Sequence, residues 1–245
     1  MERDGEVVPS DQVRTAEAPT QRGCYRKLVL VLSIVFAVVG TYLFGVWWSD
    51  PQQRALGIVS HYGGRIERDA GDVVTVYLGH SEVTDADLAI LSNLKTLRNL
   101  YLGGSLVTNA GIANLRALPV LERLELNGTR VTDDCVRLLR HHSKLRELSF
   151  DHTQLTDRGL EEIRDFIGLE RLYLKRTRVT DAGVRHLTSL QRLVWLQLSG
   201  TQITDAGLAQ LDQLKDLREL DVGETAVTRA ALEHLQRALP RLRIR

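Results

Sequence analysis

The stretch LVWLQLSGTQITDAGLAQLDQLKD, from Leu193 to Asp216, changes its hydrophobic period halfway along. Its first part follows the pattern LxxLxL, in which apolar and polar residues alternate as in a short strand with inward leucines. Thr204 then predicts a helix N-cap, and Asp205 places a carboxylate in the first turn, where the helix dipole favours it. Three leucines recur at three-residue spacing on one helical face: Leu208, Leu211 and Leu214. The stretch therefore predicts a strand, a turn and a short helix.

This unit recurs seven times without an insertion, with the pattern LxxLxLxxTxVTDAGLxxLxxL. The first apolar position of each unit lies 24 residues after the previous one: Val73, Leu97, Leu121, Leu145, Leu169, Leu193 and Leu217. A single unit cannot bury its apolar face alone, so each unit must stack on its neighbours. We therefore expect an α/β solenoid, with a parallel sheet on the concave face and short helices on the convex face.

Two columns of hydroxyl residues run through the seven units. The cap threonines are Thr84, Thr108, Thr132, Thr156, Thr180, Thr204 and Thr228. Three residues before them come Ser81, Ser105, Thr129, Thr153, Thr177, Thr201 and Thr225. Because every unit supplies a hydroxyl at the same two places, we interpret both columns as structural. Cys135 and His142 break the pattern within one unit, and we interpret them as local repacking.

The repeat resembles the leucine-rich-repeat family, and its TDAGL signature is similar to the bacterial and F-box-associated, ribonuclease-inhibitor-like subclass. The resemblance covers residues 73–240. In that family Asn or Cys usually stands where this chain has the earlier hydroxyl column, and its side chain satisfies buried backbone groups. A hydroxyl can do the same. The resemblance implies a scaffold that binds another macromolecule.

The flanks of the repeats are predicted to close their open ends. Residues 49–72 read as a linker and an N-terminal cap, with a short helix, a strand around Arg65 to Arg68 and a turn over 69–72 that leads into the first repeat strand. Residues 241–245 alternate in polarity and predict a C-terminal cap strand.

Residues 28–48 read LVLVLSIVFAVVGTYLFGVWW and carry no charge, which predicts one transmembrane helix. Arg22, Arg26 and Lys27 precede it, whereas only Arg54 follows closely, so we expect a cytoplasmic N-terminus and extracytoplasmic repeats. Residues 1–27 are expected to form a disordered cytoplasmic tail. The alternative is a cleaved secretory signal, but its apolar stretch would be shorter.

Composition and motifs indicate neither catalysis nor nucleic-acid binding. Lys plus Arg number 32 against 31 for Asp plus Glu, so no net field attracts a polyanion. Cys24 and Cys135 give no disulfide framework, and none of the histidines has a metal-ligand spacing. Without a nucleophile, acid–base or phosphate-loop motif, we predict no enzyme, no cofactor and no metal.

The strand residues that point away from the leucines define the predicted binding face. We expect Trp195 to lie beside Arg171 on the neighbouring strand, with Tyr173 diagonal to it. This group is either a binding hot spot or only an exposed cation–π pair. Tyr77 and Tyr101 should pair near the N-terminal end. The charges Arg123, Glu147, Arg171, Asp151 and Lys175 are interpreted as cross-strand ion pairs.

These features predict a membrane-anchored binding module, whose partner is a protein or an envelope polymer. An adaptor similar to the F-box leucine-rich-repeat proteins is one alternative, weakened because residues 1–72 hold no separate helical module. A structural envelope component without a specific ligand is another.

Overall fold

The computed structural model describes residues 50–245. The predicted cytoplasmic tail over 1–27 and the predicted transmembrane helix over 28–48 lie outside the described residues. Among residues 50–245, no helix is both long and apolar enough to cross a membrane.

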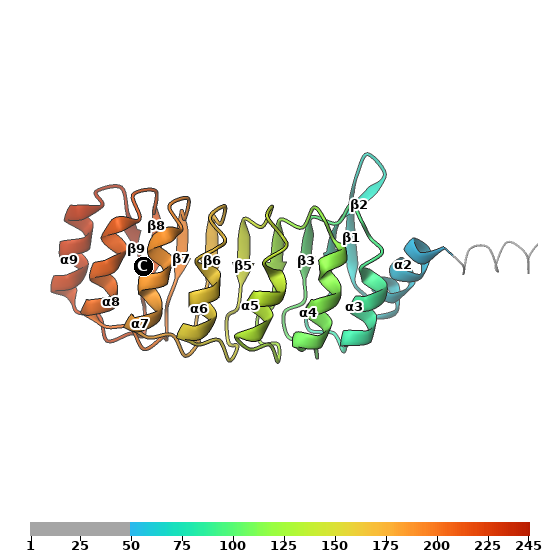
Figure 1. Cartoon of the computed structure of the whole chain (residues 1–245), viewed down its shortest axis with the longest axis horizontal. Helices are drawn as coiled ribbons and strands as arrows, with labels where there is room; N and C mark the ends of the chain where they lie inside the picture. Colours follow the sequence, from blue (N-terminus) through green and yellow to red (C-terminus); the bar gives the residue numbers. More distant parts are fainter. Residues whose placement is uncertain (1–49) are drawn as a thin grey trace, which may run out of the picture. The chain divides into compact units, whose positions relative to one another are not determined.

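One nine-stranded sheet runs through the described residues in sequence order (Figure 1). Its strands are β1 Arg65–Asp69, β2 Asp72–Tyr77, β3 Asn99–Tyr101, β4 Arg123–Glu125, β5 Glu147–Ser149, β6 Arg171–Tyr173, β7 Trp195–Gln197, β8 Glu219–Asp221 and β9 Arg243–Ile244. From β2 onward neighbouring strands are parallel, and each residue pairs with the residue 24 positions later, as Leu172 does with Leu196. The 24-residue sequence period is therefore the strand-to-strand step.

A row of short helices covers one face of this sheet (Figure 1). After α2 Pro51–His61 come α3 Asp85–Leu91, α4 Asn109–Asn114, α5 Asp134–Leu139, α6 Asp157–Ile163, α7 Asp181–Val184, α8 Asp205–Gln210 and α9 Arg229–Ala238. Single 3₁₀ turns continue three of them: η1 Leu115–Ala117, η2 Arg185–Ser189 and η3 Leu211–Gln213. The predicted α/β solenoid of parallel strands and short helices is confirmed.

The N-terminal end of the sheet is formed by a hairpin, as the sequence predicted. Strand β1 pairs antiparallel with β2, and the turn between them places Ala70 and Gly71 in left-handed conformations. Asp50 caps the start of helix α2, since its carboxylate accepts the N–H of Gln52 at 2.8 Å. Ala55 and Val59 of this helix are buried and join the core of the first repeat. At the other end, β9 pairs with β8 but is shorter than the predicted strand over 241–245.

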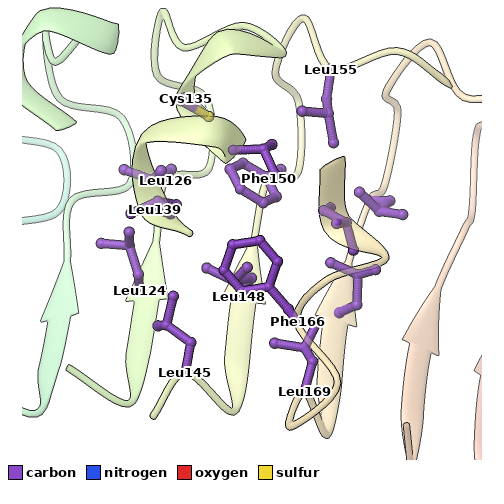
Figure 2. Packing of buried hydrophobic residues seen from close by; sticks show 14 of the residues in the cluster. Leu124, Leu126, Cys135, Leu139, Leu145, Leu148, Phe150, Leu155, Phe166 and Leu169 are labelled. Atoms are coloured by element: carbon purple, nitrogen blue, oxygen red, sulfur yellow. The ribbon is translucent and has the colours of Figure 1, made fainter. Parts of the chain in front are cut away.

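The core is a continuous stack of leucine layers in which strand and helix residues meet. Figure 2 shows the layers around β5, where Phe150 and Phe166 replace leucines. Cys135 is a buried free thiol there, and burial raises its pKa. His142 is only 5% exposed, and burial lowers its pKa, so the ring is neutral at pH 7. Both residues lie in the core, which agrees with their interpretation as local repacking.

The TDAGL aspartate links each repeat to the next, a role that the sequence reasoning missed. Asp157 accepts the backbone N–H of Thr180 at 2.8 Å and the hydroxyl of Thr180 at 2.7 Å. We call this arrangement the Asp–Thr clamp. It recurs in the pairs Asp85–Thr108, Asp133–Thr156, Asp181–Thr204 and Asp205–Thr228.

The glycine of TDAGL leaves room for the clamp. A Cβ on Gly183 would overlap the Asp157 carboxylate, and one on Gly207 would overlap that of Asp181. The signature therefore combines three roles. Its threonine donates hydrogen bonds to the aspartate of the previous repeat, its aspartate accepts them from the threonine of the next repeat, and its glycine leaves space for that carboxylate.

The joint between the second and third repeats departs from this geometry. Asn109 replaces the aspartate: its carbonyl oxygen accepts the N–H of Thr132 at 3.0 Å, and its amide donates to the Thr132 hydroxyl at 2.7 Å. Cys135 replaces the glycine, and α5 starts after Asp133 without a side-chain cap. The prediction that Thr132 caps its helix is therefore wrong. Capping by backbone N–H donation to the hydroxyl is seen at Thr108, Thr156, Thr180, Thr204 and Thr228.

The earlier hydroxyl column also has a structural role. The Thr177 hydroxyl donates to the carbonyl of Leu174, three residues back, at 2.7 Å. The same bond forms at Ser81, Thr129, Thr153, Thr201 and Thr225. Ser105 is the exception, because its buried hydroxyl has no hydrogen-bond partner among the described residues.

Candidate binding face

The sheet face opposite the helices carries two columns of side chains, which we call the open sheet face. The first column is Thr75, Asn99, Arg123, Glu147, Arg171, Trp195 and Glu219. The second is Tyr77, Tyr101, Glu125, Ser149, Tyr173, Gln197 and Asp221. The strand register places neighbours within each column side by side, as the sequence period predicted.

The predicted pairing of Tyr77 and Tyr101 takes the form of a parallel stack. Their ring centroids are 4.7 Å apart, with an interplanar angle of 11°. The Arg65 guanidinium lies over the outer face of the pair, 4.4 Å from the Tyr77 centroid. The Tyr77 hydroxyl donates to Glu67 at 3.1 Å. The cap hairpin thus fixes this aromatic pair at one end of the open sheet face.

Trp195 lies where predicted, but its cationic partner is different. Arg171 is its neighbour on β6 yet forms an ion pair with Glu147 at 3.3 Å, and the guanidinium over the indole is that of Arg245, 4.9 Å from its centroid. The ring of Tyr173 lies 6.0 Å away at 34°. Trp195 is half-buried rather than freely exposed, and its buried Nε1–H has no acceptor among residues 50–245. The predicted Arg171–Trp195 stack is therefore wrong, because the carboxylate of Glu147 holds Arg171.

Glu147 is the centre of the predicted charge series. Arg123 on β4 approaches the Glu147 carboxylate at 3.6 Å, and Arg171 on β6 approaches it from the other side at 3.3 Å. Both arginines are exposed, so each pair contributes about 0–1 kcal/mol. The predicted side-chain pair of Asp151 and Lys175 is not formed; the Asp151 carboxylate instead accepts the backbone N–H of Lys175 at 2.7 Å.

Among the carboxylates of residues 50–245 that form no side-chain ion pair, Glu125 of this face and Asp151, two residues beyond β5, have a raised pKa. Burial, followed by repulsion from Asp151 and Glu147, raises the pKa of Glu125. Burial also raises the pKa of Asp151, with Asp221 adding to the effect. Sequence reasoning missed both residues as site candidates, because the missing counter-charge depends on where the arginines pair.

The described residues offer no constellation for catalysis through a metal. In residues 50–245, no group of three or more His, Cys, Asp or Glu side chains is placed to hold a metal ion. Asn127-Gly128-Thr129 has the sequence of an N-glycosylation acceptor, but Asn127 is engaged in the fold. Its amide oxygen accepts the Ser149 hydroxyl at 2.5 Å and the Asp151 N–H at 2.9 Å. What the open sheet face offers is aromatic rings, guanidinium groups and carboxylates, which suit recognition.

Comparisons with known proteins agree with this architecture. A family model described as "Leucine Rich repeat" matches residues 141–163. Internalin C2 from Listeria monocytogenes has a similar structure, with a TM-score of 0.57 and 21% sequence identity over 78% of this chain and 80% of that chain. No curated protein matches the sequence. With its 24-residue strand step, its row of short helices and this family match, the described part of the chain has the fold of a leucine-rich-repeat solenoid.

Proposed function

We propose that the protein is a membrane-anchored binding module that takes a protein partner on its open sheet face. The observation that carries this proposal is a pair of aromatic groups on that face: Tyr77 with Tyr101, and Tyr173 with Trp195. Aromatic and arginine side chains dominate the energetics of protein interfaces. Repeat scaffolds present such extended faces to their partners, and the match to a leucine-rich-repeat model supports the same use here.

Trp195 is the strongest anchor of the face. Its ring is held between Tyr173 and Arg245, so little side-chain entropy remains to be lost when a partner binds. Its indole N–H has no acceptor within the described residues. A partner that displaces the exposed Arg245 side chain would reach the ring and supply a carbonyl acceptor to the N–H. The small loss of side-chain entropy and the new hydrogen bond would both make Trp195 a large contributor to the binding free energy.

The membrane anchor in this proposal is residues 28–48. Its support is the uncharged length of this stretch and the basic residues that precede it. The N-terminus is then cytoplasmic and the repeats are extracytoplasmic. Protease added to intact spheroplasts should remove the repeats and leave a small N-terminal fragment. Protection of the repeats from protease would contradict the orientation.

The partner test uses the full chain, solubilised from membranes in mild detergent, as bait for cross-linking and affinity capture. A captured protein is then purified and titrated against wild-type and variant chains. Trp195→Ala should weaken binding by more than about 2 kcal/mol, the hot-spot scale. Tyr101→Ala should weaken it less, because Tyr101 is already stacked on Tyr77. Since Trp195 is half-buried, we expect its replacement to lower stability by about 1–2 kcal/mol.

The matched control is Ile167→Ala. Ile167 is 69% exposed in the turn before β6, outside the open sheet face, so its loss should leave affinity unchanged. Equal affinities for wild type, Trp195→Ala and Tyr101→Ala, with folding intact, would move the site away from this face.

A further inference from the structure

Glu125 occupies an unusual place in the open sheet face. In the second column it follows Tyr101, and beyond it come the short side chain of Ser149 and then Tyr173. The two tyrosines are three strands apart, about 14 Å at ~4.8 Å per strand. Between them lie a carboxylate and a small hydroxyl side chain.

The Glu125 carboxylate fits here because Gly103, two residues after the end of β3, has no side chain. A Glu125 carboxylate oxygen lies 2.5 Å from where a Cβ on Gly103 would be, so a larger residue at 103 would displace the carboxylate. The Ser149 hydroxyl is directed away to Asn127, at 2.5 Å. Among residues 50–245, no group donates a hydrogen bond to the Glu125 carboxylate. The carboxylate is therefore half-buried and held without a donor.

The other acids of the face differ from Glu125 in this respect. Glu147 pairs with Arg123 and Arg171, and Glu219 pairs with Arg245 at 2.7 Å. Asp221 accepts the side-chain amide N–H of Gln197 at 3.0 Å. Asp151 accepts only a backbone N–H. Among the acids of the two columns, Glu125 is therefore the one to which residues 50–245 supply neither an ion pair nor a hydrogen bond.

We propose that the partner is a basic protein segment that places an arginine side chain between Tyr101 and Tyr173, against the carboxylate of Glu125. The inference rests on the proposed function, whose partner it specifies. An arginine fits because its planar guanidinium bonds carboxylates and also stacks on aromatic rings. A metal ion fits less well, since the described residues form no group of metal-capable side chains. Burial raises the pKa of Glu125, which indicates that an incoming cation would relieve an unfavourable charge.

The test uses two defined probes on the full chain in detergent micelles. One is the peptide acetyl-Gly-Ser-Arg-Ser-Gly-amide; the other has citrulline, the neutral isostere, in place of arginine. Amide NMR shifts report weak binding residue by residue. The arginine peptide should shift the Gly103 and Ser149 signals saturably and bind at least about fivefold more tightly than the citrulline peptide. Glu125→Gln should remove the difference, whereas Glu161→Gln, the same charge change on helix α6, should keep it.

Equal responses to the two peptides, or no response to either, would overturn this inference. It fails separately from the proposed function. Suppose that binding of a captured partner depends on Trp195 but persists when all the arginines of the partner are replaced. The open sheet face would then remain the binding site, and only the inference about an arginine would be refuted. A partner whose affinity does not change on replacement of Trp195, Tyr101 or Glu125 would refute both the proposed binding face and the arginine inference.

Discussion

Asp157 binds Thr180 of the following repeat twice, through the backbone N–H at 2.8 Å and through the hydroxyl at 2.7 Å. The Thr180 hydroxyl in turn accepts the N–H of Ala182 at 3.2 Å, so one threonine joins the clamp to the helix cap. Helix starts in successive repeats are thereby tied together by side chains, in addition to the backbone ladder of the sheet.

Two replacements of Asp157 distinguish the contribution of the clamp from that of the helix cap. Asp157→Ala removes both acceptors and should lower the free energy of unfolding by about 2–3 kcal/mol, as expected for bonds to a charged group. Asp157→Asn should cost only about 1 kcal/mol, the scale of a lost helix cap. Asn109 already makes the amide version of the bond with Thr132, where the cap is missing. Urea midpoints at constant m-value measure both effects; equal losses would mean that the carboxylate does not act through these bonds.

Two glycines should respond to alanine with opposite signs. In Gly183→Ala the new methyl overlaps the Asp157 carboxylate, and we expect a loss of about 1–3 kcal/mol. Gly57 lies inside helix α2 with open space around its Cα, so Gly57→Ala should stabilise by about 0.5–1 kcal/mol. Thermal midpoints compare the two, and a stabilising Gly183→Ala would show that the clamp can shift without cost.

The hydroxyl column offers another internal control. Thr177→Val keeps the shape of the side chain but removes the hydroxyl bond to the carbonyl of Leu174, which keeps the backbone N–H of Thr177 at 3.3 Å. The expected cost is that of one hydrogen bond, about 0.5–1.5 kcal/mol. Ser105→Ala removes a hydroxyl that has no partner among residues 50–245, so it should change stability by less than about 0.5 kcal/mol. Denaturation curves that place Thr177→Val at the wild-type midpoint would refute a structural role for the column.

The raised pKa of Glu125 makes a prediction about pH. In the folded chain this carboxylate, facing Asp151, Glu147 and His80, keeps its proton to a higher pH than in the unfolded chain. Its contribution therefore favours folding at low pH and declines as pH rises from the unfolded pKa through the raised folded pKa. Glu125→Gln should consequently match or exceed the wild-type urea midpoint at pH 7 and lose that advantage near pH 4. A variant clearly less stable than wild type at pH 7 would show that the ionised carboxylate stabilises the fold.

Most of the fold could be read from the chain because one period governs it. The 24-residue spacing of the leucines fixes the strand step, and the change of period at Thr204 marks where strand gives way to helix. The clamp could not be read in the same way. Asp181 favours a helix start by its charge alone, and its bonds to Thr204 become visible only when two repeats are stacked.

The candidate site was predicted as positions but not as contacts. Register alone places Trp195 beside Arg171. The Arg171 guanidinium could contact either the indole of Trp195 or the carboxylate of Glu147, and it pairs with Glu147. Arg245 covers the indole instead, from a residue 50 positions away in sequence. Competition among exposed charges involves differences of about 1 kcal/mol or less, which a residue pattern does not encode.

The exception at the joint between the second and third repeats has a mechanical consequence. If the solenoid is pulled along its stacking direction, the load is shared between the sheet ladder and the row of Asp–Thr clamps. The joint between Asn109 and Thr132 has neutral rather than charge-assisted bonds, and the helix that follows is uncapped. Under force, we expect the stack to part first at this joint, so that the repeats before it detach as one block while those after it remain folded.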